Sequence, residues 1–388
     1  MADVSDRNRS GIVAALVVIV VLVIVVLLLM TPMVQNLLKG FFEDQERYPE
    51  YAVFSIERTL EVDANGGTIL NLTLDAPRPV DISENGYELQ DIQDVTYTPL
   101  YTSSENRYGV PWTVWNGGAL EGQETYVTVI RYEVKITTRF WNYASQDVAN
   151  VSEVPVSLSN EYLHDEWKII SSASSIQSRS DSIVGDERNV YAILESIYEW
   201  VTHNIRYPTI SGDSDPQSSV ETLQSKVGDC DDQAILFSAL ARAAGVPAWL
   251  QLGALYNEIE DQWGGHGWVQ AYIPLKSGGG ANVTLDTVNG DFLVWKPNRF
   301  VDFTDDGNGD HLRDYYYTFY CTYEPSSYPS GVDPEYTEDY VALSYEESSN
   351  KVDRGDFAVS MISSGHEGSL IALDSIRATC TSPVPARR

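Results

Sequence analysis

The chain has 388 residues, in which 56 acidic residues outnumber 25 basic ones and give a formal net charge of -31. Such a surface repels phosphate backbones, so nucleic acid is excluded as an expected partner. Hydrophobic residues make up 43% of the chain, which excludes a wholly disordered protein. The acids are spread along the whole sequence, and we therefore interpret the charge as an aid to solubility rather than as a site for cationic substrates.

The first predicted element is an apolar run from Gly11 to Met30 that contains no charge and no proline. About 20 helical residues at ~1.5 Å each span the ~30 Å hydrocarbon core of a bilayer. The run is longer than the apolar part of a signal peptide and no small-residue cleavage pattern follows it, which favours a retained anchor over a cleaved signal. A pilin-type leader is the least favoured alternative.

Arg7 and Arg9 precede this run, and the positive-inside tendency places such a basic tail in the cytoplasm. We therefore expect residues 1–34 to be a cytoplasmic tail and a single-pass anchor in the cell membrane. Residues 11–30 would contact the lipid bilayer, and the bulk of the chain would be extracellular.

Strand patterns begin after a mixed stem at residues 35–49. The run TILNLTL at 68–74 follows an Asn-Gly-Gly turn signal, and YVTVIRYEVKITT at 126–138 alternates apolar and polar residues. These patterns predict an antiparallel β-sandwich over residues 50–160.

The pattern then changes to helical. Apolar residues at i, i+3 and i+4 spacing predict a helix over residues 186–204, which Asp186 would cap. Ser218 and Glu221 have the spacing of a capping box, and a further helix is predicted over 230–244. Short strand-like runs follow at 248–252, 268–273 and 283–285. Residues 161–325 therefore read as one α+β domain.

Cys230 stands where a Gly-Asp-Cys turn enters an apolar helix. The positive end of the helix dipole favours a thiolate there, and the free backbone N–H of the first turn can help to form an oxyanion hole. The neighbouring Asp229, Asp231 and Asp232 oppose a thiolate. A reactive thiol at this position therefore requires a close positive partner, for which a histidinium is the usual choice.

His266 lies between two glycines at the start of a predicted strand, and Asp286 lies at the end of another. A carboxylate in that position can hold the tautomer of an imidazole and stabilise the imidazolium. Cys230, His266 and Asp286 are therefore predicted to form a catalytic triad.

The segments around these residues resemble the core of the transglutaminase-like superfamily. The likeness rests on Gly228-Asp229-Cys230 with the following helix through Pro247, on His266-Gly267-Trp268-Val269, and on Asp286, and it covers about residues 185–300. Two positions depart from the family pattern, because alanine is common where Gly267 stands and proline where Thr287 stands.

The resemblance implies a papain-like α+β core after the transmembrane helix and the antiparallel β-sandwich. It implies acyl transfer through a thioester on Cys230, without a cofactor, on a peptide or protein substrate at the cell surface. Tyr207 or Gln224 would supply the second oxyanion donor. Resolution of the thioester by water would give a protease or amidase, which we favour. Resolution by an amine would give a crosslinking transamidase, and an inactive peptide-binding or structural envelope module is the third alternative.

An acidic loop over residues 302–310 raises the question of a calcium site. Counting from Asp302 places Gly307 at the sixth position of an EF-hand pattern, but Arg313 stands at the twelfth, where a glutamate is needed. We therefore expect a solvated loop and no metal, with Asp302, Asp306 and Asp310 as weak candidate ligands.

The last part of the chain is harder to interpret. Cys321 and Cys380 could form a disulfide that leaves Cys230 free, although sequence does not establish the pairing. The tyrosine-rich run at 315–320 is expected to pack as a strand on the core. Residues 326–388 form an acidic region to which no role is assigned.

Overall fold

The computed structural model describes residues 46–208, 215–317 and 319–357. The expected transmembrane run at 11–30 lies outside these ranges, and so does Cys380. Within them, no helix is both long enough and apolar enough to cross a membrane. The described residues from Tyr48 onward belong to one compact unit.

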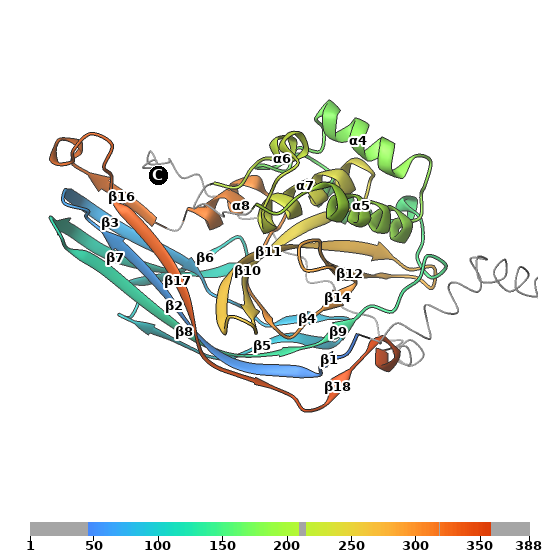
Figure 1. The fold of residues 1–388 in the computed structure, drawn as a ribbon, viewed down its shortest axis with the longest axis horizontal. Helices are drawn as coiled ribbons and strands as arrows, with labels where there is room; N and C mark the ends of the chain where they lie inside the picture. The colour runs from blue at the N-terminus through green and yellow to red at the C-terminus, as the bar shows by residue number, and fades with distance from the viewer. Residues whose placement is uncertain (1–45, 209–214, 318, 358–388) are drawn as a thin grey trace, which may run out of the picture. The chain divides into compact units, whose positions relative to one another are not determined.

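Two antiparallel sheets form a sandwich (Figure 1). In the strand Tyr51–Asp63 every second side chain is buried, and the strand Thr125–Thr137 shows the same alternation over most of its length. The five-stranded sheet has the order β17-β2-β8-β5-β4, and the four-stranded sheet has the order β16-β3-β7-β6. The strands of the first are β17 (Glu335–Glu347), β2 (Tyr51–Asp63), β8 (Thr125–Thr137), β5 (Tyr87–Thr98) and β4 (Ile82–Glu84). Those of the second are β16 (Phe319–Tyr323), β3 (Thr68–Pro77), β7 (Val110–Glu121) and β6 (Ser103–Arg107).

Two of these strands come from beyond the range in which the sequence indicated the sandwich. β16 pairs with β3, and β17 pairs with β2 over nearly its whole length, so that chain segments almost 300 residues apart lie side by side. β17 is an edge strand whose side chains are mostly exposed, and it therefore lacks the strict apolar alternation that marks a half-buried strand. For that reason its sequence shows only an acidic composition and no clear strand pattern.

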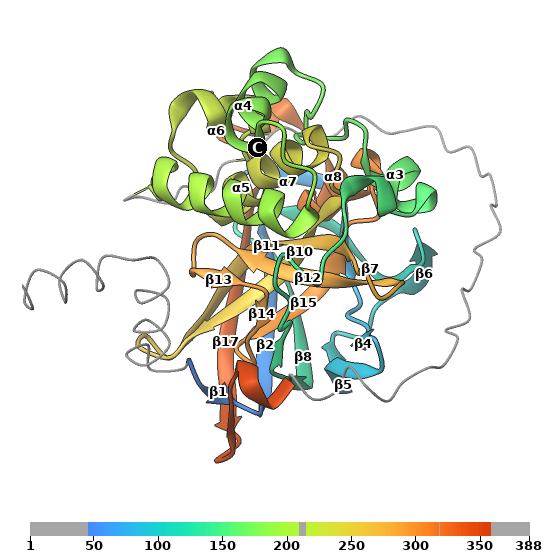
Figure 2. The ribbon, with the colours of Figure 1, turned by 90° about the vertical axis from the view of Figure 1, so that its right-hand side faces the viewer.

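The second part of the unit is a five-stranded antiparallel sheet with helices packed against it (Figure 2). Its strand order is β13-β12-β11-β10-β15. The strands are β13 (Asp291–Phe292), β12 (Gly280–Asp286), β11 (Gln262–Pro274), β10 (Ala248–Asn257) and β15 (Arg299–Thr304). The helices are α3 (Val156–Tyr162), α4 (Ser174–Val184), α5 (Val190–Asn204), α6 (Ser219–Ser225), α7 (Cys230–Ala243) and α8 (Gly309–Tyr316). Small two-stranded pairs join β1 (Tyr48–Pro49) to β18 (Lys351–Val352) and β9 (Arg139–Phe140) to β14 (Val294–Trp295).

Three local predictions can be compared with these elements. The capping box of Ser218 and Glu221 opens α6 as expected. The predicted start at Asp186 was wrong, because the side chain of Asn189 accepts the N–H of Ala192 and begins α5 there. The tyrosine-rich run was expected to be a strand, and Phe319 and Tyr320 do begin β16, but Tyr315 and Tyr316 lie in α8, which Asn308 caps.

A buried ion-pair network joins the sandwich to the helical part. Arg58 of β2 is 1% exposed, and its guanidinium lies 2.8 Å from Asp302 Oδ2 on β15 and 2.8 Å from Glu338 Oε1 on β17. The hydroxyl of Tyr315 donates to Asp302 Oδ1 at 2.9 Å. Burial raises the pKa of Asp302 to about 6, although Arg58 acts to lower it. Asp302 is thus an internal ion-pair partner on a strand, and the prediction that it lies in a solvated loop was wrong.

Apolar contacts follow the same interface. The ring of Phe54 lies 4.6 Å from that of Trp263, and the ring of Tyr132 lies 5.0 Å from that of Phe300. Trp263 is 5% exposed, so it belongs to the core. One hydrophobic cluster therefore runs through both parts of the unit.

Replacing Arg58 tests whether this network holds the two parts together. Arg58→Met leaves Asp302 and Glu338 without their shared cation, and breaking a buried pair in this way costs about 3–5 kcal/mol of unfolding free energy. The matched control is Arg131→Met, which removes a pair with Glu57 in which the arginine side chain is 59% exposed and which is worth about 1 kcal/mol or less. Urea denaturation measures both variants, and equal losses would contradict the assignment.

Candidate active site

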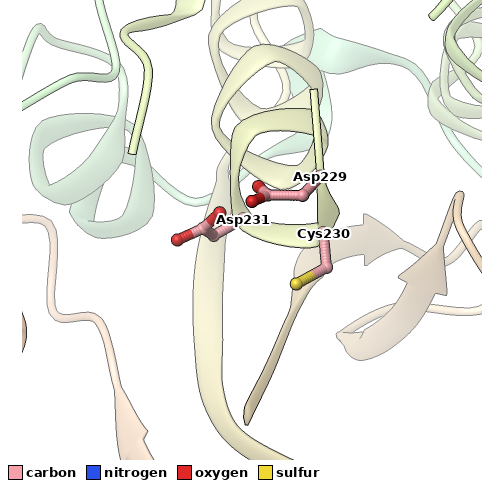
Figure 3. Close-up of side chains that lie close together, drawn as sticks. All are labelled: Asp229, Cys230 and Asp231. Carbon is pink, nitrogen blue, oxygen red and sulfur yellow. The ribbon is translucent and has the colours of Figure 1, made fainter. Parts of the chain in front are cut away.

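The nucleophile turn is fixed by the cap of α7. The side chain of Asp229 accepts a hydrogen bond from the N–H of Asp232, and the side chain of Asp232 accepts one from the N–H of Asp229. Together these two bonds form a capping box. Cys230 is therefore the first helical residue, with its side chain at the helix start beside Asp229 and Asp231 (Figure 3). The remainder of α7 is held in place by its buried apolar residues from Ala234 to Ala241.

His266 and Asp286 are brought together by the pairing of β11 with β12. His266 is 9% exposed, and its Nε2 lies 2.8 Å from Asp286 Oδ2. The other carboxylate oxygen of Asp286 accepts the backbone N–H groups of Val288 and Asn289, each at 3.1 Å. These bonds fix the carboxylate, so the imidazole is oriented with Nδ1 left as the ring nitrogen that can serve Cys230.

The electrostatics of this pair favour an imidazolium. Burial acts to lower the pKa of His266, but Asp286 and a hydrogen bond with Cys230 outweigh it and raise that pKa to about 10. For Asp286, burial acts to raise the pKa, while His266 and Arg299 hold it well below its usual range. Asp286 is therefore ionised, and His266 carries a proton at neutral pH.

The acids around the nucleophile carry less charge than the sequence indicated. Burial raises the pKa of Asp231 well above its usual range, and Asp229 and Asp232 add to the shift. Burial and Asp229 also raise the pKa of Asp232, whose carboxylate accepts bonds from the backbone and side chain of Gln217 at 2.5 and 2.7 Å. A raised pKa weakens the opposition of these two acids to a thiolate on Cys230.

The two predicted oxyanion residues have different surroundings. Tyr207 is 45% exposed, and burial together with the nearby Cys230 raises its pKa to about 12, so its hydroxyl stays a donor at neutral pH. Gln224 lies exposed on α6 and makes no hydrogen bond to the triad within the described residues. Gln233 is buried, but its amide already donates to Gly228 O and accepts from Thr287.

Residues outside the predicted triad also contact it. The amide of Asn289 donates to Asp286 Oδ2 at 2.8 Å and lies 3.0 Å from His266 Nε2. Asn289 could have been suspected from sequence, since it follows Asp286 in a turn. Trp268 stacks on the ring of His266 at 5.8 Å, and the Arg299 guanidinium lies over Trp268 at 5.1 Å. Nothing in the sequence near Arg299 points to this contact.

Each of the three weak metal candidates contacts a basic side chain in the structure. Asp302 is engaged by Arg58, the carboxylate of Asp306 contacts His311 at 2.8 Å, and Asp310 pairs with Arg313 at 3.6 Å. Across the described ranges, the only close group of three possible ligands is Asp229, Cys230 and Asp231, which is the nucleophile turn itself.

The comparisons with known proteins agree with this geometry. Residues 177–285 match the model of the transglutaminase-like superfamily, so the chain contains a transglutaminase-like domain, with Cys230 and His266 inside the match and Asp286 directly after it. This confirms the resemblance seen in the sequence.

Solved structures extend the likeness beyond that domain. A proposed cysteine protease from Cytophaga hutchinsonii is 16% identical, with a TM-score of 0.53 over 80% of this chain and 97% of its own, which shows a shared fold. The periplasmic domain of TgpA from Pseudomonas aeruginosa is 12% identical over 63% of this chain and 88% of its own, with a TM-score of 0.31. None of the curated proteins matches the sequence.

The raised pKa of His266 predicts a pH-dependent stability. The native state binds this proton more tightly than the unfolded chain, so the stabilisation is complete below about pH 6.5 and is lost as pH rises to about 10. His266→Ala should flatten this part of the pH profile of unfolding free energy, measured by urea titration. Replacing the exposed His203 by alanine is the control and should leave the profile unchanged.

Proposed function

We propose that this protein is a membrane-anchored, extracellular cysteine enzyme that hydrolyses peptide or amide bonds through a thioester. The observation that carries the proposal is the position of His266, whose ring nitrogen lies 2.8 Å from the carboxylate of Asp286 and whose pKa is raised by Asp286 and by the nearby Cys230. The anchoring part rests on the uncharged run from Gly11 to Met30.

In this mechanism the Cys230 thiolate attacks the substrate carbonyl carbon and forms a tetrahedral oxyanion. The backbone N–H of Cys230 and the neutral hydroxyl of Tyr207 would donate to it. His266 gives its proton to the leaving nitrogen, the C–N bond breaks, and a thioester remains. His266 then takes a proton from water, whose oxygen attacks the thioester, and the acid product leaves as the thiolate is restored.

Hydrolysis is favoured over transamidation because the nucleophile is open to water. Cys230 is partly exposed, and Tyr207 beside it is 45% exposed. Water at high concentration therefore competes well for a thioester at this position. The structural neighbour described as a proposed cysteine protease supports the same choice. The inactive-module alternative is disfavoured by the intact contact between His266 and Asp286.

Alkylation of Cys230 tests the ion pair. The full chain is treated under reducing conditions with iodoacetamide across a pH range, and mass spectrometry reads each cysteine separately. Cys230 should react fast at neutral pH and at least about ten-fold more slowly in His266→Ala, because the imidazolium stabilises the thiolate. Cys321 is an internal reference, since burial and Asp333 raise its pKa to about 11. A wild-type Cys230 that titrates like a free thiol, with a pKa near ~8.5, would contradict the proposal.

The preference for hydrolysis is tested by whether an acyl group on Cys230 is transferred to water or to an amine. An activated ester such as p-nitrophenyl acetate should acetylate Cys230, and the Cys230→Ala variant should release no nitrophenol above background. With a primary amine present, we expect mainly acetate rather than the N-acetyl amine, measured by mass spectrometry. A predominance of the amide would instead establish the transamidase alternative.

A further inference from the structure

The triad is the inner end of a longer series of alternating charges. Beyond Asp286 lies the guanidinium of Arg299, with its Nη2 3.7 Å from Asp286 Oδ2 and 2.6 Å from Asp291 Oδ2. Asp291 Oδ1 in turn lies 2.5 Å from the Nζ of Lys296. In order from the nucleophile, the series runs Cys230, His266, Asp286, Arg299, Asp291 and Lys296.

Burial makes this arrangement unusual. Arg299 is 0% exposed, Asp286 and Asp291 are each 2% exposed, and only Lys296 at the outer end approaches solvent. Charges in such an environment are screened poorly, so each one acts strongly on its neighbours. Burial raises the pKa of Asp291, while Arg299 and Lys296 act to lower it.

Arg299 is costly to keep in this place. Its Nε and Nη1 atoms are buried and have no hydrogen-bond partner within the described residues, and unsatisfied buried donors are destabilising. Buried ion pairs can often be replaced by apolar groups without loss of stability. The charge of Arg299 is compensated by Asp286 and Asp291, so the guanidinium acts directly on the carboxylate of the triad.

We propose that Arg299 is a positioning residue for catalysis, which separates Asp286 from Asp291 and holds the Asp286 carboxylate ionised and turned toward His266. This inference rests on the proposed function, in which Cys230 and His266 react as an ion pair. Trp268 completes the arrangement, because its indole contacts the guanidinium of Arg299 and stacks on the ring of His266. Its Nε1 donates to Gln251 at 3.1 Å, which fixes the ring.

Removing the guanidinium would leave two buried carboxylates facing each other. Their repulsion raises the pH at which Asp286 ionises and turns it away from His266. The imidazolium then loses its partner, and the thiolate of Cys230 forms only at higher pH. Arg299 therefore affects the shape of the pH profile of Cys230 reactivity, and a residue that only stabilises the fold would not.

Several other titratable groups face the triad, and all remain in place in the variants below. Near the nucleophile, the start of α7 contributes Asp229, Asp231 and Asp232. The helix α8 contributes Tyr316, and the segment after α5 contributes Tyr207. A change in the profile is therefore assigned to the substituted residue.

The experiment is iodoacetamide alkylation of Cys230 in the full chain across pH, with each rate divided by the same variant's rate at high pH. In Arg299→Met, the normalised rate at neutral pH should fall by about ten-fold, the equivalent of ~1 pKa unit. Arg299→Lys retains a cation between the carboxylates and should recover most of the wild-type shape. If Arg299→Met does not fold, Lys296→Met, at the outer end of the series, is tested in its place. Its normalised rate at neutral pH should also fall, by a smaller factor.

Arg242→Met is the matched control. Arg242 is also fully buried, pairs with two carboxylates (Glu166 and Asp305), and lies 5.7 Å from a tyrosine ring. It stands 12 residues along α7 from Cys230, which is about 18 Å of helix. Its loss should lower stability without changing the normalised profile. Equal profiles for Arg299→Met, Arg242→Met and wild type would overturn the inference. If Cys230 of the wild-type protein instead titrates like a free thiol, it forms no ion pair with His266, and both proposals are wrong.

Discussion

The buried hydrogen bond between His266 and Asp286 is the interaction on which the site depends. Two charges at this depth are expensive to remove from water, and they persist only where further bonds satisfy them. The backbone N–H groups of Val288 and Asn289, the amide of Asn289 and the charge of Arg299 all converge on the one carboxylate. The turn after β12 and the strand β15 are therefore as necessary to the imidazolium as the carboxylate itself.

The nucleophile turn carries acidic residues beside Cys230, where a negative charge disfavours a thiolate. Asp229 and Asp232 are the reciprocal cap of α7, so they cannot be removed without loosening the helix start that positions Cys230. Burial eases the conflict, since it raises the pKa of Asp231 and Asp232 and so weakens their opposition to a thiolate.

Sequence was sufficient where function depends on local pattern. The capping box at Ser218, the start of α7 at Cys230 and the strands that carry His266 and Asp286 were all predicted from short segments. It was insufficient where the partner is distant. Arg58 contacts residues 244 and 280 positions away, and no periodicity encodes such contacts. The role of β17 was missed for a related reason, since an edge strand buries too little to show a pattern.

The sandwich has a direct physical connection to the triad through one short strand. β15 carries Arg299, which lies against Asp286, and three residues later Asp302, which Arg58 of the sandwich holds at 2.8 Å. Between them, the side chain of Gln90 on β5 bonds both backbone groups of Val301, at 2.9 Å to its N–H and 2.8 Å to its carbonyl. Because β15 is clamped at two successive residues, the guanidinium of Arg299 cannot shift along the strand axis. The sandwich therefore fixes the position of the charge that lies behind the triad, which gives this domain a role in the chemistry as well as in the fold.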